Sequence, residues 1–305
     1  GQRTTITARR AVVLASGGFG ANKEMSKNYF PNPDVHISVQ PDENVGDGIK
    51  LGQRVGGQLG EVNPDNGVFA PVSFLRRKDG SLSKFPHFGP DRGKPGSIIV
   101  DEQGQRFTNE AGPYQEFVGT MNELEMNKAW LVGSRRFLRK YGMGMALPAP
   151  YPLGSLVRDG YLITGKTLAD LAAKIGVPAS KLEQTVADFD AHAVKGEDPQ
   201  FQRGTNTYDP SQGDPTHKPN SNVGPVGEGP YYALALYPGN ASTVLGMATD
   251  VNAQVLDDAG NAIEGLYAVG LDQNTVFRGK YPGGGSSIGP AMTFGYRAAR
   301  HIAAK

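Results

Sequence analysis

The alternation of apolar and polar residues predicts β-strands near both ends of the chain. Residues 4–9 alternate weakly, and residues 11–14 form a continuous apolar run, which is typical of a buried parallel strand. The run ends in the small residues Ser16, Gly17 and Gly18. Open α/β sheets bind ligands beyond the carboxyl ends of such strands. A tight turn into a helix, without any ligand, is the alternative explanation for these small residues.

The segments that follow predict one helix, one loop and one hairpin. Residues 44–57 predict a short helix that begins at Asp47 and ends at Gly56. Asp47 would serve either as the N-cap of this helix or as a ligand of a sugar hydroxyl. Residues 74–95 are rich in glycine, proline and charge, and they predict a loop. Residues 97–107 predict a hairpin that turns at residues 101–104.

The middle of the chain predicts two helices. Thr167 and Asp170 have the spacing of a capping box, which starts a helix that ends at Gly176. Pro178 opens a second helix, which ends before Gly196. A long polar connection, rich in glycine and proline and irregular in structure, would follow over residues 198–229.

The sheet pattern returns toward the end of the chain. Residues 231–239 predict a strand, and a hairpin with its turn at residues 257–260 follows. A final helix over residues 290–303 has four candidates for its buried face: Met292, Tyr296, Ala299 and Ile302. Sheet segments therefore flank a mixed middle, which indicates an insertion between two halves of one α/β domain.

The composition argues against nucleic-acid and membrane partners. The 305 residues carry a formal net charge of +1, which gives no electrostatic attraction for nucleic acid. The apolar runs are far shorter than the ~20 residues of a membrane span. The sequence has no cysteine and five scattered histidines, so neither disulfides nor a metal site are predicted. The absence of cysteine fits a reducing compartment, and we expect a cytoplasmic location.

Five motifs occur in an order that resembles a superfamily of FAD flavoproteins. They are RRAVVLASGGFG, VGDGIKLG, VDEQGQRFTNEAGPY, GLYAVG and YPGGGSSIGPAMTFGYRAARHIA, and together they cover nearly the whole chain. The superfamily contains fumarate reductases, succinate dehydrogenase flavoproteins and 3-ketosteroid dehydrogenases. The last motif resembles the 3-ketosteroid Δ1-dehydrogenase branch. The resemblance implies an FAD-dependent oxidoreductase of the α/β class.

The resemblance also implies how the chain is divided. Residues 1–72 and 237–305 would form the C-terminal part of a Rossmann-like FAD-binding domain, and residues 73–236 an inserted α+β substrate (capping) domain. The superfamily normally begins with a strand, a G-x-G-x-x-G turn and a helix, and no such motif is present here. We therefore expect that this first βαβ unit is absent, and that the chain needs its N-terminal half, for example as a separate chain, to bind FAD tightly.

Ten residues are predicted to contact FAD. The glycine-rich turn after Tyr281 opens a helix that would approach the flavin ring, where backbone N–H groups stabilise the negative charge of the reduced flavin. After GLYAVG the superfamily usually has glutamate or asparagine, whereas this chain has Leu271 and then Asp272. The predicted cofactor-binding residues are Ser16, Gly17, Gly18, Asp47, Gly270, Leu271, Asp272, Ser286, Ser287 and Ile288.

Three residues match the catalytic positions of the 3-ketosteroid dehydrogenases. Tyr281 and the backbone N–H of Gly285 would hold the carbonyl oxygen of the substrate and stabilise an enolate. Tyr114 would remove the proton alpha to the carbonyl, and a hydride from the beta carbon would reduce FAD. The resemblance thus implies that a bulky ketone is desaturated, or an enone reduced. A core aromatic residue without catalytic function is the alternative for Tyr114.

Two other functions remain open at this stage. The first is a fumarate-reductase-like enzyme that acts on a small unsaturated acid. Tyr281 disfavours it, because fumarate reductases have arginine there, although Arg278 and Lys280 are nearby cations. The second is a catalytically incomplete fragment that needs its N-terminal half. The RFTNE stretch contributes Arg106, Asn109 and Glu110. A structural role, in which this cluster ties the hairpin to the flavin domain, is our first interpretation.

Overall fold

The computed structural model describes residues 4–89 and 91–305, and these residues form two compact units. Unit 1 contains the chain up to Asp34, residues 40–68 and residues 240–305. Unit 2 contains residues 35–39 and 69–239. The main part of unit 2 is therefore inserted between two sequence segments of unit 1.

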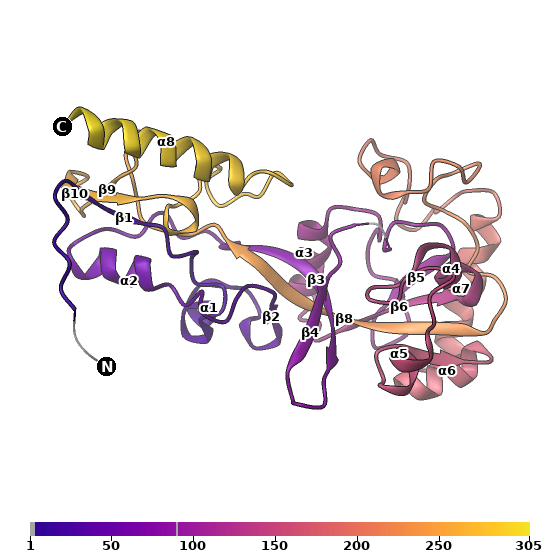
Figure 1. The fold of residues 1–305 in the computed structure, drawn as a ribbon. Helices are drawn as coiled ribbons and strands as arrows, with labels where there is room; N and C mark the ends of the chain where they lie inside the picture. Colours follow the sequence, from indigo (N-terminus) through magenta and orange to yellow (C-terminus); the bar gives the residue numbers. More distant parts are fainter. Residues whose placement is uncertain (1–3, 90) are drawn as a thin grey trace. The chain divides into compact units, whose positions relative to one another are not determined.

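Unit 1 is built on a three-stranded sheet in the order β1-β10-β9 (Figure 1). Strands β1 and β10 are parallel, with Val13 opposite Tyr267, and β9 pairs antiparallel to β10. The elements of this unit are β1 (Val12–Leu14), α1 (Lys23–Tyr29), α2 (Asp47–Arg54), β9 (Gln254–Leu256), β10 (Ala262–Ala268), the 3₁₀ turn η3 (Gly270–Asp272) and α8 (Ile288–Ala304); a further turn, η1 (Pro33–Val35), lies where the chain enters unit 2.

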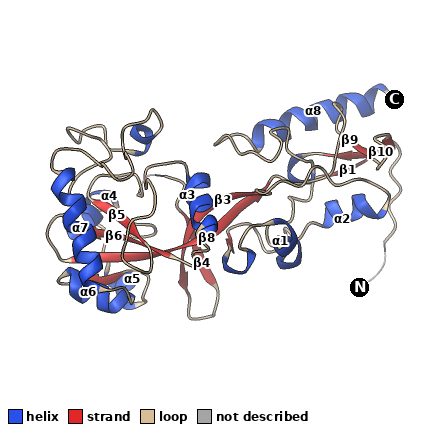
Figure 2. Ribbon diagram, turned by 180° about the vertical axis from the view of Figure 1, so that it is seen from behind, coloured by secondary structure: helices blue, strands red, loops and turns tan. Residues whose placement is uncertain are grey.

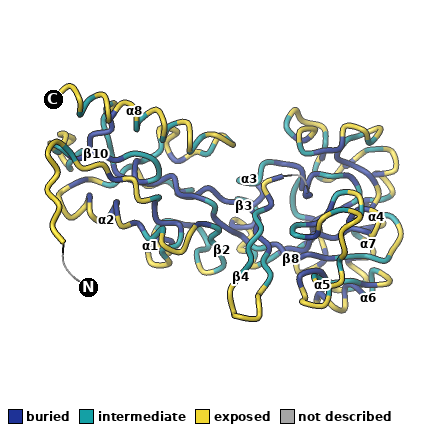
Figure 3. Tube along the Cα trace, viewed as in Figure 1, coloured by how far each residue is buried: buried dark blue, intermediate teal, exposed yellow. Residues whose placement is uncertain are grey.

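The final helix is confirmed, but of the four residues predicted for its buried face only Ile302 packs on the sheet. Figure 3 shows exposed positions along α8, and the side chains of Met292 and Tyr296 are 69% and 64% exposed. The face that packs on the sheet contains Ala298 instead, flanked by Phe294 and Ile302, against Tyr267. The buried face is therefore rotated around the helix from the one that the apolar residues of α8 suggest.

Strand β1 is confirmed in position, but its predicted burial is largely wrong. Leu14 is buried, whereas Val12 and Val13 are 49% and 44% exposed. The reason is that β1 is an edge strand of the three-stranded sheet, so one side has no neighbour among the described residues. The weak alternation over residues 4–9 does not form a strand.

Unit 2 is built on a second sheet, whose strands run in the order β4-β3-β8-β6-β5. Figure 2 shows these five strands in red, and β2 and β7 also pair with β8. Its strands are β2 (Ile37–Ser38), β3 (Gly67–Arg76), β4 (Leu82–Pro86), β5 (Ser97–Val100), β6 (Ala129–Ser134), β7 (Ile163–Gly165) and β8 (Tyr231–Thr243). Its helices are α3 (Tyr114–Glu123), α4 (Arg135–Tyr141), α5 (Gly154–Arg158), α6 (Leu168–Ile175), α7 (Ala179–Ala193) and the 3₁₀ turn η2 (Asp209–Gln212).

Helices α6 and α7 confirm the sequence prediction. The Thr167 hydroxyl accepts a hydrogen bond from the N–H of Asp170 at 3.1 Å, and Gly176 ends α6 in the left-handed conformation at φ 75°. Both helices pack on the sheet through apolar residues such as Leu171 and Leu182, which contribute to one buried cluster with Val132. The irregular connection predicted over residues 198–229 is also observed, apart from the short turn η2.

Two predictions for unit 2 are wrong. Residues 74–95 do not form one loop, because β3 continues to Arg76 and pairs antiparallel with β4. The residues of β4 are all half-buried, so their side chains show no clean alternation. Residues 104–107 do not return as a strand, although the turn at Asp101 forms. Strand β5 pairs with β6 instead, Val100 lying opposite Trp130.

Across residues 4–89 and 91–305, no helix combines the length and the apolar character that a membrane crossing requires.

Candidate functional site

The carboxyl ends of β1 and β10 bring together several residues that the sequence predicts to bind FAD. Asp272 is fully buried, and its carboxylate accepts hydrogen bonds from the N–H of Ser16 at 2.5 Å and of Gly18 at 3.1 Å. The Ser16 hydroxyl donates to the same carboxylate at 3.1 Å and accepts from the N–H of Gly48 at 2.9 Å. Because β1 and β10 are parallel neighbours, the turns that follow them lie at one edge of the sheet.

The polar groups of this cluster bond mainly to one another, so they fix the backbone rather than point toward a ligand. Asp272 engages the N–H groups of Ser16 and Gly18, so these two donors already have a protein acceptor. Gly48 allows α2 to pack closely, since a Cβ there would lie 2.1 Å from the Asp272 carboxylate. Asp47 is exposed at the first position of α2, and the N-cap is Gly46, at φ 81°. The N-cap explanation for Asp47 is therefore wrong, and its contact with a sugar hydroxyl stays a prediction.

A small cavity of unit 1 lies beside Tyr281. Its volume is about 20 Å³, and polar residues dominate its lining. The lining includes Thr243, Gly270, Leu271, Asn274, Thr275, Lys280, Tyr281, Ser286 and Ser287. Five of the sequence-predicted site residues, Gly270, Leu271, Tyr281, Ser286 and Ser287, thus share one depression.

Thr243 is a residue of this cavity that the sequence did not reveal. Its hydroxyl oxygen is buried and has no hydrogen-bond partner among the described residues. A Cβ on Gly18 would lie 2.3 Å from this oxygen and 3.0 Å from the Cβ of Leu271, so only glycine fits at position 18. Thr243 lies between Ser242 and Val244 at the end of a strand pattern, which gives no sign of a ligand. An unpaired buried hydroxyl does call for an external polar partner.

The glycine-rich turn leads into α8 with open space around it. A Cβ on Gly283, Gly284 or Gly285 would meet no atom within 4 Å, and Gly283 and Gly285 have φ angles of 139° and 96°. Helix α8 has Ser287 at its N-cap position, and no side chain caps the helix. Among the described residues, the N–H groups of Ser287 and Ile288 have no protein acceptor. They lie at the positive end of a 17-residue helix.

These features fit the flavin ring of FAD. The ring has a polar edge with carbonyl oxygens and ring nitrogens, which would accept the uncapped N–H groups of α8 and the Thr243 hydroxyl. The glycines leave room for a flat group to approach the backbone. The part of unit 1 around Tyr281 therefore has hydrogen-bond donors and a helix N-terminus suited to this group, and open space around the glycines rather than in the cavity.

Tyr114 lies in unit 2, at the first position of α3. Its side chain is half-buried, and its ring contacts that of Phe88 edge-to-face, with centroids 5.0 Å apart. The next residue, Gln115, accepts the N–H of Phe69 through its side-chain carbonyl at 2.6 Å. Phe88 is 41% exposed, so Tyr114 is not part of a closed aromatic core.

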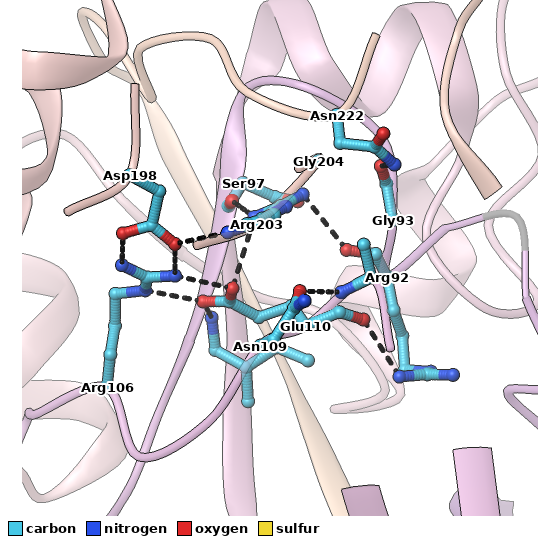
Figure 4. A network of polar contacts seen from close by, with 12 residues as sticks. Arg92, Gly93, Ser97, Arg106, Asn109, Glu110, Asp198, Arg203, Gly204 and Asn222 are labelled. Carbon is cyan, nitrogen blue, oxygen red and sulfur yellow. Dashed lines mark hydrogen bonds and ion pairs between the residues drawn. The ribbon is translucent and has the colours of Figure 1, made fainter. Parts of the chain in front are cut away.

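A buried charge network supports the segment that leads to Tyr114 (Figure 4). Arg106 lies between two carboxylates and donates to Glu110 at 2.7 Å and to Asp198 at 2.7 and 2.8 Å. Burial alone would raise the pKa of Glu110, but the charges of Arg106 and Arg203 outweigh it and hold that pKa below its usual value. The structural interpretation of Arg106 and Glu110 agrees with this arrangement, because their charges are satisfied within unit 2.

Arg92 and Arg203 are two further buried cations that sequence reasoning missed. Arg203 is fully buried and donates to the carbonyl oxygens of Ser97, Arg92 and Lys94 at 2.8, 3.1 and 2.6 Å. Each arginine stands in a loop that the sequence marks as irregular. A single arginine in a loop gives no signal that distinguishes a buried anchor from a solvated one.

Comparisons with known proteins identify the family of the chain. Residues 1–288 match the family described as "FAD binding domain". The 4-oxocyclohex-2-ene-1-carboxylate 5-dehydrogenase of Sinomonas cyclohexanicum is 41% identical over 98% of this chain and 51% of its own length. The 3-oxosteroid 1-dehydrogenase of Mycobacterium tuberculosis (strain ATCC 25618 / H37Rv) is 40% identical over 98% of this chain and 53% of its own length.

A solved structure gives the same result. The 3-ketosteroid Δ1-dehydrogenase of Sterolibacterium denitrificans, in complex with 1,4-androstadiene-3,17-dione, matches with a TM-score of 0.89 and 38% identity over 99% of this chain and 55% of its own chain. This chain thus spans about half the length of the relatives that it matches. The α/β fold, the likeness to ketone dehydrogenases and FAD as the cofactor of the family agree with the sequence prediction. The chain belongs to the FAD binding domain family.

Proposed function

We propose that this chain is part of an FAD-dependent dehydrogenase that desaturates the carbon–carbon bond next to a ketone. The observation that carries the proposal is the position of Tyr281, which lines a polar depression beside the uncapped N-terminus of α8. A phenol can donate one hydrogen bond to a neutral carbonyl oxygen, whereas a carboxylate substrate calls for a cation. The names of the relatives, which are dehydrogenases of oxo compounds, support the same class of substrate.

In this proposal, unit 1 is the C-terminal part of a Rossmann-like FAD-binding domain, and unit 2 is the substrate (capping) domain. The flavin ring would be held by Ser286, Ser287, Ile288 and the Thr243 hydroxyl. The turns at Ser16 and Gly270 would support the ribityl chain of FAD. When bound, FAD would supply the acceptor for the hydride, which carries two electrons and one proton from the substrate. The N-terminus of α8 would favour the negative charge that this reduction adds.

The side chains have complementary roles toward the substrate. The Tyr281 hydroxyl and the Gly285 N–H would donate hydrogen bonds to the ketone oxygen and so stabilise the enolate that forms when a proton leaves the alpha carbon. Tyr114 would accept that proton. The hydride leaves the beta carbon, and the two carbons are then joined by a double bond conjugated with the carbonyl group. A free phenol has a pKa of ~10, so Tyr114 needs nearby positive charge or hydrogen-bond donors to act as a base at neutral pH.

The substrate class that we propose is a cyclic ketone. The relatives act on steroid and on oxocyclohexene carboxylate rings, by their names. Lys280 lines the same cavity as Tyr281 and would provide a cation for a substrate that carries a carboxylate. A 3-oxosteroid and 4-oxocyclohex-2-ene-1-carboxylate are therefore the two substrates to compare first.

We also propose that another stretch of polypeptide completes the FAD-binding unit. The two exposed valines of β1 lie on an edge that is unpaired among the described residues, and parallel strands are ordinarily buried on both faces. Leu51 and Val55 of α2 add exposed apolar surface within the same unit. The part of the relatives that this chain does not match is the partner that we propose for this edge, through a strand that pairs with β1.

A titration and one substitution test the proposal. We expect the chain alone to bind FAD weakly, and to bind it tightly once the matching region of the longer relatives is added, as measured by flavin fluorescence. In the FAD-loaded protein, Tyr281→Phe should lower kcat with a 3-oxosteroid by about 10²-fold, the range seen when one oxyanion donor is lost. Tyr296→Phe, on the exposed side of α8, is the matched control and should keep full activity.

Two outcomes would contradict the proposed function. If fumarate is turned over faster than both cyclic ketones, the enzyme is one that acts on small unsaturated acids. An unchanged kcat for Tyr281→Phe, with normal FAD content, would show that this phenol does not contact the reacting carbonyl group.

A further inference from the structure

Arg92 is a buried cation that the proposed reaction does not use directly. Its side chain is 1% exposed, and burial lowers its pKa to about 10, so it still carries its charge at neutral pH. Among the described residues it makes no direct ion pair with a carboxylate. Its guanidinium donates only to backbone carbonyl oxygens. A buried cation that has carbonyl oxygens but no carboxylate in direct contact is uncommon.

The three carbonyl groups that Arg92 binds belong to two segments that meet at Tyr114. Nη1 donates to the carbonyl oxygen of Glu110 at 2.9 Å, and Nη2 donates to that of Gly112 at 3.3 Å. These residues lie four and two positions before Tyr114. Nε donates to the carbonyl oxygen of His87 at 3.0 Å, and His87 precedes Phe88.

Phe88 and Tyr114 are in ring contact, so Arg92 connects both partners of an aromatic pair through the backbone. The guanidinium also lies over the ring of Phe117, 5.0 Å from its centroid, on the first turns of α3. The N-terminus of α3 needs such support, because Pro113 occupies its N-cap position and no side chain caps it. One planar, five-donor group thus holds the helix start and the neighbouring segment in a fixed relation.

We propose that Arg92 is a positioning residue for Tyr114. The proposal rests on the proposed function, in which Tyr114 accepts the alpha proton. Proton transfer needs donor and acceptor within hydrogen-bond reach, and a displacement of about 1 Å can cost about 10²-fold in rate. Loss of the guanidinium should therefore affect proton removal much more than substrate binding.

The buried charge network of Arg106, Glu110 and Arg203 fixes the backbone segments that Arg92 connects. The carbonyl oxygen of Arg92 accepts a hydrogen bond from Arg203, and the Glu110 carboxylate is held by Arg106 (Figure 4). The backbone at Arg92 and the backbone at Glu110 are both held in this way. Arg92 adds its own contacts to the carbonyl groups of Glu110 and Gly112, just before Tyr114.

The test uses the FAD-loaded protein, a 3-oxosteroid and a redox dye as the electron acceptor. Arg92→Lys keeps the charge but replaces three directed donors by a flexible ammonium group. We expect kcat to fall about 10- to 100-fold, KM to change less than about threefold, and the deuterium isotope effect at the alpha carbon to increase. Val186→Ala, in the core around α7, is the control for general destabilisation, and it should leave the isotope effect unchanged.

A double-mutant cycle separates this proposal from the proposed function. Arg92→Lys should have little effect in a Tyr114→Phe background, since no phenol is left to position. If Tyr114→Phe alone is fully active, the base assignment and the role of Arg92 fall together. If Tyr114→Phe is inactive but Arg92→Lys keeps kcat and the isotope effect of the unsubstituted protein, only the positioning proposal is overturned.

A second variant covers the case in which Arg92→Lys does not fold. Phe88→Leu removes the aromatic contact from a side chain that is 41% exposed, so folding should be preserved. A several-fold loss of kcat with an increased isotope effect would support the proposal. Unchanged values for this variant would overturn it, because the segment bound through His87 would then have no influence on Tyr114.

Discussion

At the residue scale, the charges of unit 2 make its stability depend on pH. The pKa values of Glu110 and Asp198 are both lowered in the folded state, because the neighbouring arginines outweigh the effect of burial. A carboxylate with a lowered folded-state pKa stabilises the fold at every pH above its unfolded-state pKa, and that stability is lost as the pH falls through the folded-state value. Unit 2 should therefore lose stability as the pH drops below about 4.5.

Glu110→Gln is the substitution that tests this dependence. At pH 7 it should lower the free energy of unfolding by about 3–5 kcal/mol, because Arg106 and Arg203 lose a buried counter-charge. The decline of stability between pH 5 and pH 3, values chosen to bracket a carboxyl pKa of about 4.3, should also become shallower. Urea unfolding at several pH values measures both effects. Glu123→Gln, exposed on α3, is the control, and an equal loss in that variant would contradict the argument.

At the scale of single elements, the cap of α6 offers a clean prediction. The Thr167 hydroxyl satisfies the N–H of Asp170, and the residue is exposed, so its removal leaves no cavity. Thr167→Ala should lower the free energy of unfolding by ~1 kcal/mol, and Thr167→Gly by only a few tenths. Denaturant midpoints of the two variants give the comparison. Equal stability of the alanine variant and the unsubstituted protein would show that the cap contributes nothing.

Elements with their own local signals could be predicted from the sequence. Helix α6 has a cap, an apolar face and a terminal glycine, and the turn after β9 has its glycine at Gly260, so both appear where expected. The pairing of β5 with β6 could not be predicted, since nothing near Val100 specifies a partner 30 residues away. The buried face of α8 differs from the predicted one for a related reason: the most apolar stripe includes Met292, which is 69% exposed, whereas the sheet packs against Ala298.

The candidate site also contains some residues that local sequence signals could predict and others that they could not. The turns at Ser16 and Ser286 follow from glycine patterns and from the family resemblance, because close backbone approach demands glycine. Thr243 and Arg92 could not be found in this way. Each acquires its significance from distant neighbours, Gly18 and Gly112 respectively, which only the folded chain brings near.

At the scale of the whole molecule, the two units should respond differently to FAD. The proposed flavin contacts lie in unit 1, and a ligand that binds only the folded state stabilises it by ~2.7 kcal/mol at 100 times its Kd. Hydrogen exchange should therefore slow in β1, η3 and the first turns of α8 when FAD is bound. Helices α6 and α7 of unit 2 serve as the internal control. Equal protection of α7 and α8 would mean that the FAD contacts are not confined to unit 1.

The neighbouring strands β3 and β8 have a consequence for how such an enzyme can change during evolution. The chain enters the main part of unit 2 at Phe69 and leaves it at Gly239, and β3 and β8 are hydrogen-bonded neighbours. Gly239 packs so closely that a Cβ there would lie 3.0 Å from the Ala70 carbonyl oxygen. When the two ends of an insertion lie side by side, the insertion can be exchanged, enlarged or shortened while β3 and β8 remain paired. Exchange of the segment between Phe69 and Gly239 would change unit 2 and leave the sheet of unit 1 in place.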